Sequence, residues 1–332
     1  MGGDHAPGEI LAGCFQAAPL LDPTDSILLV GDEAVSRSAL EAAGLPPAKR
    51  EAYKIVPTTE VVTMDDSPVE AIRGKPNSSI AVMCKMAAKG EAEAVISAGN
   101  TGACVAASQL RMRLLPGVSR PGIAVILSTF HGPVVVCDVG ANISPKAKHL
   151  EQYAIMGSAF STALAGIENP RVGLLSIGEE YAKGTPVVKD AARMMKDEPL
   201  INFVGNVEGR DLFAGAVDVV VCDGFVGNIV LKFTEGLAAG LFQTIEADLR
   251  RESPQSVDLI KPVMQKIYQK HDWRHYGGAP LLGVGGYTMI CHGRSDARAI
   301  MNAVRVTRQL VASGINKKIV ETIQASIPVE ED

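Results

Sequence analysis

Short runs of Val, Ile and Leu alternate along the chain with segments whose apolar residues recur at helical spacing. Most of these runs are unbroken, which is typical of strands buried on both faces of a parallel sheet. The first lies at residues 26–33, ends in Gly-Asp, and leads into a helical pattern that reaches Ala43. Further strands are predicted in YKIVPT, AVISAGNTG, GIAVILST, PVVVCDVGAN, VGLLSIGEE, INFVGNVEG, VDVVVCDGFVGN and TMICHG.

Helical patterns separate most of these strands, at residues 78–91, 101–115, 146–164, 186–196, 229–251 and 296–313. Alternation of this kind predicts an α/β fold with three α/β/α layers, in which helices cover both faces of a doubly wound, mostly parallel sheet. We find no internal repeat and no low-complexity linker, so we expect a single domain over residues 1–332.

One segment departs from this alternation. From residue 253 to 275 the strands stop and a charged helical pattern takes over, followed by the glycine-rich HYGGAPLLGVGGY. We expect a helical insertion at residues 253–280 that protrudes from the sheet as a hairpin. Its apolar positions would contact a second subunit or a membrane surface, and a dimer contact is the favoured interpretation. These positions are Leu259, Val263, Ile267 and Trp273.

Composition and charge narrow the classes of function. The formal net charge of −5 argues against a general affinity for nucleic acid, because no strongly basic face is implied. Six cysteines occur singly, several inside apolar runs, which predicts buried thiols in a reduced compartment rather than a disulfide framework. The best candidate for a membrane span, VGNIVLKFTEGLAAGLF, contains Lys232 and Glu235, so we expect a cytoplasmic protein.

Five predicted strands end in loops that combine glycine with Asn, Asp, Glu, Lys or Thr: SAGNTG, CDVGANIS, SIGEEYAKGT, VGNVEGRD and CDGFVGN. In open α/β sheets a ligand binds outside the carboxyl ends of the strands. Glycine lets the backbone approach a ligand closely, and asparagine offers both a donor and an acceptor. The sequence therefore predicts an anion site at this edge. The candidate residues are Asn100, Thr101, Gly102, Asn142, Glu179, Lys183, Asp223, Gly227 and Asn228.

Each candidate also has a purely structural interpretation. Asn100 and Asn142 could be turn residues, and Asp223 begins a frequent Asp-Gly turn pair. Glu179 could be a solvated acid at the start of a helix. Lys183 is more informative because it precedes Gly-Thr at a predicted helix N-terminus, where a cation suits phosphate or an oxyanion.

Common catalytic motifs are missing. The sequence contains no GxxxxGK[ST] phosphate loop, no GxGxxG after a strand and no GxSxG nucleophile turn. Anion-binding loops without an obvious side-chain nucleophile suit a reaction in which the anion itself attacks. The protein would then supply positioning and electrostatic stabilisation.

A family resemblance covers nearly the whole chain. MGGDHAP, TMDDSPVEAIR, SAGNTGA, DVGANIS, NPRVGLLSIGEE, KGT, INFVGNVEGRDL and VDVVVCDGFVGNIVLK resemble, in this order, the bacterial phosphate acyltransferases of phospholipid synthesis. The resemblance implies a Rossmann-like fold related to phosphotransacetylases and isocitrate-dehydrogenase-like enzymes. It also implies a homodimer that attaches peripherally to the membrane.

The resemblance further implies a reaction. Acyl-acyl carrier protein and inorganic phosphate would give acyl phosphate, which a membrane glycerol-3-phosphate acyltransferase would consume on the way to phosphatidic acid. Lys183 and Asn228 would hold phosphate or the developing oxyanion, and His5 would transfer a proton. Asp4 would bind substrate with the strand-end residues, and no metal or organic cofactor is implied.

The chain departs from the family pattern at a few places. Val226 stands where the family has threonine, and Ser176 and Thr185 replace asparagines. Family members carry a short strand before MGGDHAP, so we expect the natural protein to start upstream of Met1.

Two other classes of function stay open. A decarboxylating dehydrogenase on a related fold would need a nicotinamide site and an aspartate cluster for a metal, and the pair Asp65 and Asp66 is a small cluster for that purpose. A non-catalytic scaffold for lipid synthesis would bind carrier protein without consuming phosphate.

Overall fold

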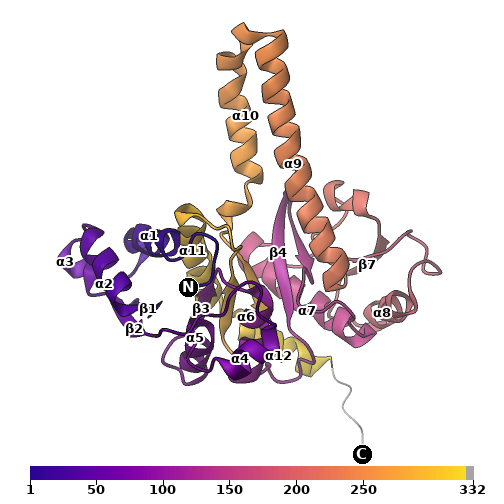
Figure 1. Ribbon diagram of the computed structural model, residues 1–332. Coiled ribbons are helices and arrows are strands. Elements are labelled where there is room, and N and C mark those ends of the chain that lie inside the picture. Colours follow the sequence, from indigo (N-terminus) through magenta and orange to yellow (C-terminus); the bar gives the residue numbers. More distant parts are fainter. Residues whose placement is uncertain (327–332) are drawn as a thin grey trace, which may run out of the picture. The chain divides into compact units, whose positions relative to one another are not determined.

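A computed structural model describes residues 1–326, apart from the side chains of Tyr268, Lys270, His271 and Trp273. The chain forms two compact units (Figure 1). The first comprises Met1–Ile123 and Tyr276–Asp332, and the second Ala124–His275. The description of residues 1–332 as a single domain stays a prediction.

The first unit contains a two-stranded parallel sheet and the strands β3, β10 and β9 in that order. β10 is parallel to β3 and antiparallel to β9. The small sheet was expected to belong to the main one. β9 was not predicted, since glycines flank it and Pro280 lies within it. The strands are β1 (Ile27–Gly31), β2 (Tyr53–Pro57), β3 (Ala94–Ser97), β9 (Ala279–Leu282) and β10 (Tyr287–Ile290).

The helices of this unit pack around those strands. α5 and α11 both contact β3, and α1 lies along α11. α6 ends at Ala107 and continues as a π-helix over Ser108–Met112, so the single helix predicted to residue 115 is interrupted. The helices are α1 (Gly8–Gln16), α2 (Glu33–Ala42), α3 (Pro47–Arg50), α4 (Pro68–Gly74), α5 (Ser79–Ala88), α6 (Thr101–Ala107), α11 (Ala297–Ser313) and α12 (Ile315–Ala325).

The second unit is built on the strand order β4-β5-β8-β6-β7. β4 and β5 form an antiparallel hairpin, whereas β5, β8, β6 and β7 are parallel to their neighbours. β8 is fully buried, as its unbroken run of valines predicts. The strands are β4 (Gly122–Thr129), β5 (Gly132–Cys137), β6 (Val172–Leu175), β7 (Phe203–Val207) and β8 (Val219–Val221).

Helices and a long hairpin complete the second unit. α7 (Ala147–Ala165) packs on β5 and β8, and α8 (Pro186–Asp197) packs on β7. α9 (Gly224–Glu252) and α10 (Val257–His271) lie side by side as the predicted helical hairpin (Figure 1). α9 starts five residues before the predicted helix, because Asp223 caps it by accepting a hydrogen bond from the Val226 N–H at 2.9 Å.

Candidate functional site

Four loops in the second unit follow the carboxyl ends of parallel strands. They come after β5, β8, β6 and β7, which are neighbours in this order. The carboxyl ends of parallel neighbours meet at one edge of a sheet. The prediction that the polar loops CDVGANIS, SIGEEYAKGT, VGNVEGRD and CDGFVGN follow strand ends at one edge is therefore confirmed for this unit.

Asp138 organises the loop after β5. Its carboxylate is fully buried and accepts hydrogen bonds from the backbone N–H groups of Gly140, Ala141 and Asn142, at 3.2, 3.0 and 2.7 Å. The Asn142 side chain turns inward and donates to the Tyr153 hydroxyl at 2.7 Å. The loop backbone is thus fixed by a buried charge, which is a rigid basis for a binding loop.

Glycines bring the first turn of α9 against this loop. The Gly224 N–H donates to the Asn142 carbonyl oxygen at 2.8 Å. A Cβ atom at Gly224 would lie 2.7 Å from Asp138 Oδ2, and one at Gly227 only 1.9 Å from the Asp138 carbonyl oxygen. Both positions therefore need glycine for close packing rather than for a turn.

The early start of α9 changes the setting of two predicted residues. Gly227 and Asn228 lie inside the helix and not in a loop, since Asp223 is the helix cap. Gly227 is buried and Asn228 is exposed. The structure thus brings Asn142, Asp223 and Gly227 together around Asp138, with Asn228 exposed on the adjoining turn.

Lys183 and Glu179 lie in the loop between β6 and α8, and both side chains are exposed. Lys183 folds back over the loop, where a Cβ at Gly178 would lie 3.1 Å from its Cγ. Glu179 lies 3.6 Å from Arg210 at the surface. No ion pair of Lys183 occurs among residues 1–326, so its charge is available to an anion in this region.

The first unit holds the other predicted residues, beginning with Asn100 at the carboxyl end of β3. Asn100 caps α6 by accepting from the Ala103 N–H at 2.9 Å. Its amide nitrogen donates to the carbonyl oxygens of Thr63, Met64 and Asp66, at 3.1 to 3.2 Å. Asn100 therefore ties the TMDD segment to the start of α6, and a contact with substrate stays a prediction.

The neighbours of Asn100 form an exposed surface. Thr101 is exposed, while Gly102 lets α4 approach, because a Cβ there would lie 2.6 Å from Pro68 Cγ. Asp4 and His5 are also exposed, and the Asp4 N–H donates to the Gly293 carbonyl oxygen after β10 at 2.9 Å. In this unit Asn100, Thr101 and Gly102 follow the end of β3, whereas Asp4 and His5 precede α1 and are tied to the segment after β10 by the Asp4 N–H.

Sequence reasoning missed Asp138, Tyr153, Ser176 and Asn206 as residues that shape these loops. A signal for Asp138 was present, since this aspartate follows the apolar run VVVC and lies two residues before Gly140. A carboxylate at such a position is buried and must be paired with N–H donors. The signal for Ser176 and Asn206 was weaker, because both are ordinary polar residues at the ends of strands.

The cysteines offer no activated thiol. All six are free, and five of them are buried. Burial raises the pKa of each thiol, to about 12 for Cys14 and Cys291 and to about 11 for Cys84. The pKa values of the remaining three thiols also lie well above the ordinary value. Thiolates are therefore scarce at neutral pH.

Among the described residues, no three His, Cys, Asp or Glu side chains gather as metal ligands would. Asp66 forms an ion pair with Lys75 at 2.5 Å and accepts from the Thr63 N–H at 2.7 Å. The hydrogen bond from Lys75 lowers the pKa of Asp66, so this carboxylate is ionised and already engaged.

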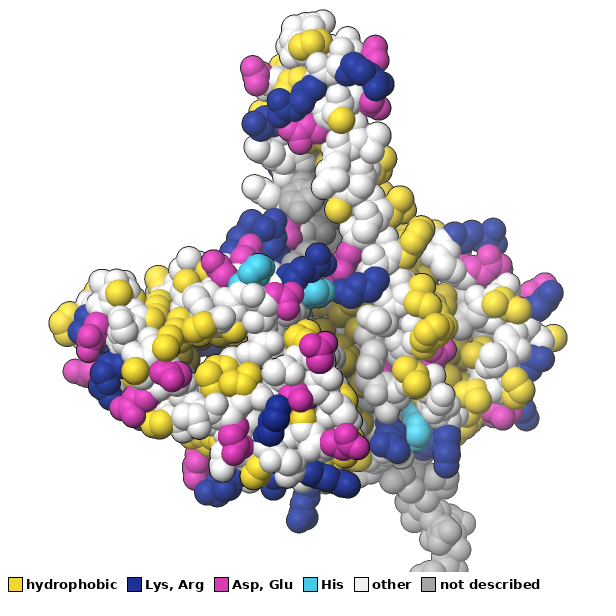
Figure 2. Space-filling view, viewed as in Figure 1, with side chains coloured by type: hydrophobic (Ala, Val, Ile, Leu, Met, Phe, Trp, Pro, Cys, Tyr) yellow, Lys and Arg dark blue, Asp and Glu magenta, His cyan; other side chains and the backbone are white. Residues whose placement is uncertain are grey.

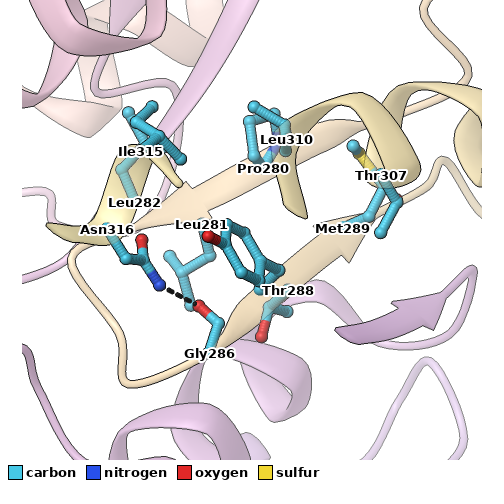
Figure 3. Close-up of a pocket in the computed structure, with 11 residues that line it drawn as sticks. Pro280, Leu281, Leu282, Gly286, Thr288, Met289, Thr307, Leu310, Ile315 and Asn316 are labelled. Atoms are coloured by element: carbon cyan, nitrogen blue, oxygen red, sulfur yellow. Dashed lines mark hydrogen bonds between the residues drawn. The ribbon is translucent and has the colours of Figure 1, made fainter. Parts of the chain in front are cut away.

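Figure 3 shows a small pocket in the first unit, lined by residues of β9, β10, α11 and α12 and by the loop before β10. Its volume of about 10 Å³ holds one water molecule at most. Asn316 closes one side by donating to the Gly286 carbonyl oxygen at 2.8 Å (Figure 3). The pocket is too small for a substrate, so the strand-end loops are the better candidate site.

Comparison with known proteins decides the family. The model of a family described as "Fatty acid synthesis protein" matches residues 1–318. Phosphate acyltransferase from Heliobacterium modesticaldum is 46% identical over 330 residues, covering 99% of this chain and 96% of its own. The chain belongs to the phosphate acyltransferase family. A phosphate acyltransferase from Nostoc punctiforme is 42% identical over 340 residues, covering 100% of this chain and 96% of its own.

Solved structures show the fold of this family member. A phosphotransacetylase from Streptococcus pyogenes matches with a TM-score of 0.61 at 17% identity, covering 91% of each chain. The EutD phosphotransacetylase from Staphylococcus aureus matches with a TM-score of 0.53 at 14% identity, covering 91% of this chain and 99% of its own. The predicted Rossmann-like α/β/α fold is confirmed. Membership of the phosphate acyltransferase family shows that the protein is an acyltransferase.

Proposed function

We propose that the protein transfers an acyl group from acyl carrier protein to inorganic phosphate, which gives acyl phosphate as the first step towards phosphatidic acid. Membership of the phosphate acyltransferase family carries this proposal. The rigid Asp138 loop and the uncompensated charge of Lys183, both following parallel strands of one unit, support it.

The reaction needs an anion as nucleophile and no activated side chain. A phosphate oxygen attacks the thioester carbonyl carbon, a C–O bond forms, the C–S bond breaks, and the thiolate of the carrier leaves and takes up a proton. Lys183 would neutralise the charge of phosphate or of the oxyanion, and Asn228 would donate a hydrogen bond to it. His5 is the candidate for proton transfer to the leaving thiolate.

The remaining predicted residues would shape the site. Asn142, Asp223 and Gly227 fix the loop and the helix turn that approach the ligand. Asp4, Thr101, Gly102 and Glu179 are proposed substrate contacts, and Asn100 would position Thr101 and Gly102 by capping α6 and bonding to the TMDD segment. No metal or organic cofactor takes part in the proposed reaction.

The carrier protein is the proposed macromolecular substrate. Carrier proteins of this kind are acidic, so Lys and Arg side chains near the strand-end loops would receive them. The candidates are Arg111 and Arg113 in the first unit and Lys146 and Lys148 in the second. Lys148 forms an ion pair with the buried Glu151, which leaves Lys146 as the better candidate of that pair.

The hairpin carries a long apolar face. Six large apolar side chains repeat at every fourth residue along α9, each between 38% and 67% exposed, and Figure 2 shows hydrophobic side chains along this helix. α10 adds exposed positions, whereas the Trp273 side chain lies outside the described residues. The exposed apolar residues are Phe225, Ile229, Phe233, Leu237, Leu241 and Ile245 on α9 and Leu259, Val263 and Ile267 on α10.

A homodimer through this face is the favoured arrangement. Burying one such side chain contributes about 1.5–3 kcal/mol, so burying several of these exposed side chains in a contact favours association. α9 is also long and apolar enough to cross a membrane by length and composition, with 6% of its most apolar window buried. The cations at the hairpin end are paired, Arg250 with Glu246 and Arg251 with Asp248, which weakens attraction to anionic lipid.

A cytoplasmic dimer that touches the membrane peripherally would deliver acyl phosphate to a membrane glycerol-3-phosphate acyltransferase. Replacing Phe233 by Asp should convert a dimer to a monomer in sedimentation analysis, because a charge would be buried in the apolar face. A variant that stays dimeric but no longer floats with lipid vesicles would instead assign this face to the membrane.

The experiment that tests the function compares Lys183→Ala with Lys189→Ala. Both variants lose one lysine of the second unit, but Lys189 belongs to the first turn of α8 and not to the loop that carries Lys183. With palmitoyl-acyl carrier protein and phosphate, the wild type should release thiol and form a product that hydroxylamine traps. Lys183→Ala should lose about 100-fold in turnover with little change in stability, and Lys189→Ala should keep its turnover.

Equal turnover of Lys183→Ala and the wild type would remove Lys183 from the site. Thiol release at the same rate with and without phosphate would identify a thioesterase instead. Binding of carrier protein without any thiol release would favour the scaffold.

A further inference from the structure

Among the buried polar atoms of the second unit that have no hydrogen-bond partner in the described residues, two lie at the ends of neighbouring strands. They are Asn206 Oδ1 in β7 and Ser176 Oγ, the first residue after β6. Asn206 is only 6% exposed. Buried polar atoms are almost always paired, so two unpaired atoms at neighbouring strand ends point to a missing partner.

Both side chains project from the same face of the sheet. Asn206 lies opposite Leu174 in the parallel pairing, and Ser176 is two residues beyond Leu174. A bulge produces this register, because Val172 pairs with Phe203 but Gly173 pairs with Gly205. Without the extra residue, Asn206 would lie opposite the next residue of β6 and face the other side of the sheet.

The loop that carries Lys183 passes over these two atoms. Asn206 Nδ2 donates to the Glu180 carbonyl oxygen at 3.1 Å, which fixes the orientation of the amide and turns Oδ1 away from that carbonyl. A Cβ at Gly184 would lie 2.9 Å from Ser176 Oγ. The loop is thus closely packed over one unpaired acceptor and one unpaired hydroxyl, with a lysine on the same loop.

We propose that Asn206 and Ser176, together with Lys183, form the phosphate-binding site of this enzyme and select phosphate over sulfate. This inference rests on the proposed function and assigns two further residues to it. Binding requires the loop at residues 177–184 to move away from these two atoms, because it is packed directly over them. Asn206 then determines the preference for phosphate over sulfate, and Ser176 positions the anion.

The chemistry of phosphate matches the two atoms. At neutral pH, hydrogen phosphate keeps a P–OH group that donates a hydrogen bond, and its other oxygens accept. Asn206 Oδ1, which can only accept, would receive the P–OH hydrogen. Ser176 Oγ would donate to a phosphate oxygen, and the Lys183 ammonium would balance the charge. Sulfate has no proton to donate and would leave Asn206 Oδ1 unpaired.

The test uses Ser176→Ala and a matched control, Ser161→Ala. Ser161 on α7 is also buried, 1% exposed, and its hydroxyl likewise has no partner among residues 1–326. Binding of inorganic phosphate is measured by calorimetry for the wild type and for both variants, and the KM for phosphate is measured separately from kcat.

The proposal predicts that Ser176→Ala weakens phosphate binding about tenfold, as the loss of a hydrogen bond to a charged ligand would. The same variant should be as stable as the wild type or more so, because its hydroxyl is unpaired in the free protein. Ser161→Ala should bind phosphate normally. In Asn206→Ala the preference for phosphate over sulfate should fall about tenfold.

Two results would overturn the proposal. The first is phosphate binding by Ser176→Ala that equals binding by Ser161→Ala. The second is a crystal structure with phosphate that shows only a trapped water between Ser176 and Asn206. A wild type that binds phosphate but forms no acyl phosphate would instead count against the proposed function alone. If Asn206→Ala fails to fold, the comparison of Ser176→Ala with Ser161→Ala still tests the proposal.

Discussion

Replacing Gly227 by alanine would place a methyl group inside the contact between α9 and the Asp138 loop. The new Cβ would lie 1.9 Å from the Asp138 carbonyl oxygen and 2.9 Å from Cys222 Sγ. A carbon–oxygen contact is normally about 3.3 Å or longer, so the first turn of α9 would have to withdraw by more than about 1 Å. The hydrogen bond from Gly224 to Asn142, now 2.8 Å, would then be lost.

The magnitude follows from three contributions. Overpacking of a rigid contact costs about 1–3 kcal/mol, and the lost hydrogen bond costs about 1 kcal/mol. Alanine has a higher helix propensity than glycine, which raises the free energy of unfolding by about 1 kcal/mol. We therefore expect Gly227→Ala to lower the free energy of unfolding by about 1–3 kcal/mol and to reduce turnover strongly, because the turn that carries Asn228 is displaced.

Gly236→Ala is the matched control, since Gly236 lies on the same helix and a Cβ there has no neighbour within 4 Å. That variant should gain up to about 1 kcal/mol in stability. Urea unfolding followed by circular dichroism measures both variants, and the phosphate-dependent release of thiol measures turnover. A Gly227→Ala variant as stable and as active as Gly236→Ala would refute the packing argument.

Two further predictions concern pH and reactivity. Asp218 accepts from the Arg171 Nε at 2.9 Å and from a terminal guanidinium nitrogen at 3.0 Å, and these bonds hold its pKa below 3.8. Its stabilisation is therefore present at neutral pH and is lost as the pH falls below about 4. Asp218→Asn should unfold about 1–2 kcal/mol more easily at pH 7, and this difference should shrink as the pH falls and Asp218 becomes protonated; a difference that does not shrink in acid would contradict this origin. The six thiols should resist iodoacetamide at pH 8 in the folded protein and react in urea, as counted by mass spectrometry, and rapid labelling without urea would show that burial does not protect them.

The sequence predicted the parallel strands well because their burial leaves a simple pattern. An unbroken run such as Val219–Val221 can lie only in the interior, and the polar residues after it must then lie at the strand ends. For the same reason most of the candidate residues could be placed at the carboxyl ends of the strands, and their role in binding stays a prediction. Their division between two compact units depends on long-range packing and leaves no local pattern.

Glycine residues caused the main errors in the elements predicted from the sequence. Gly224 and Gly227 were interpreted as loop residues, although they lie at the start of α9 and permit close approach to Asp138. Turn glycines and packing glycines are identical in sequence, and only the tertiary contact distinguishes them. The bulge at Gly205 turns Asn206 toward the loop that carries Lys183. It was not predicted, because the sequence does not show which structural role a glycine has.

The stoichiometry of the reaction tests the central claim most directly. Purified protein is incubated with palmitoyl-acyl carrier protein and radiolabelled phosphate, and the released thiol is counted against the label recovered in acyl phosphate. The account predicts one labelled acyl phosphate for each thiol released, and no thiol release without phosphate. Thiol release without incorporation of label would show that water, and not phosphate, is the nucleophile.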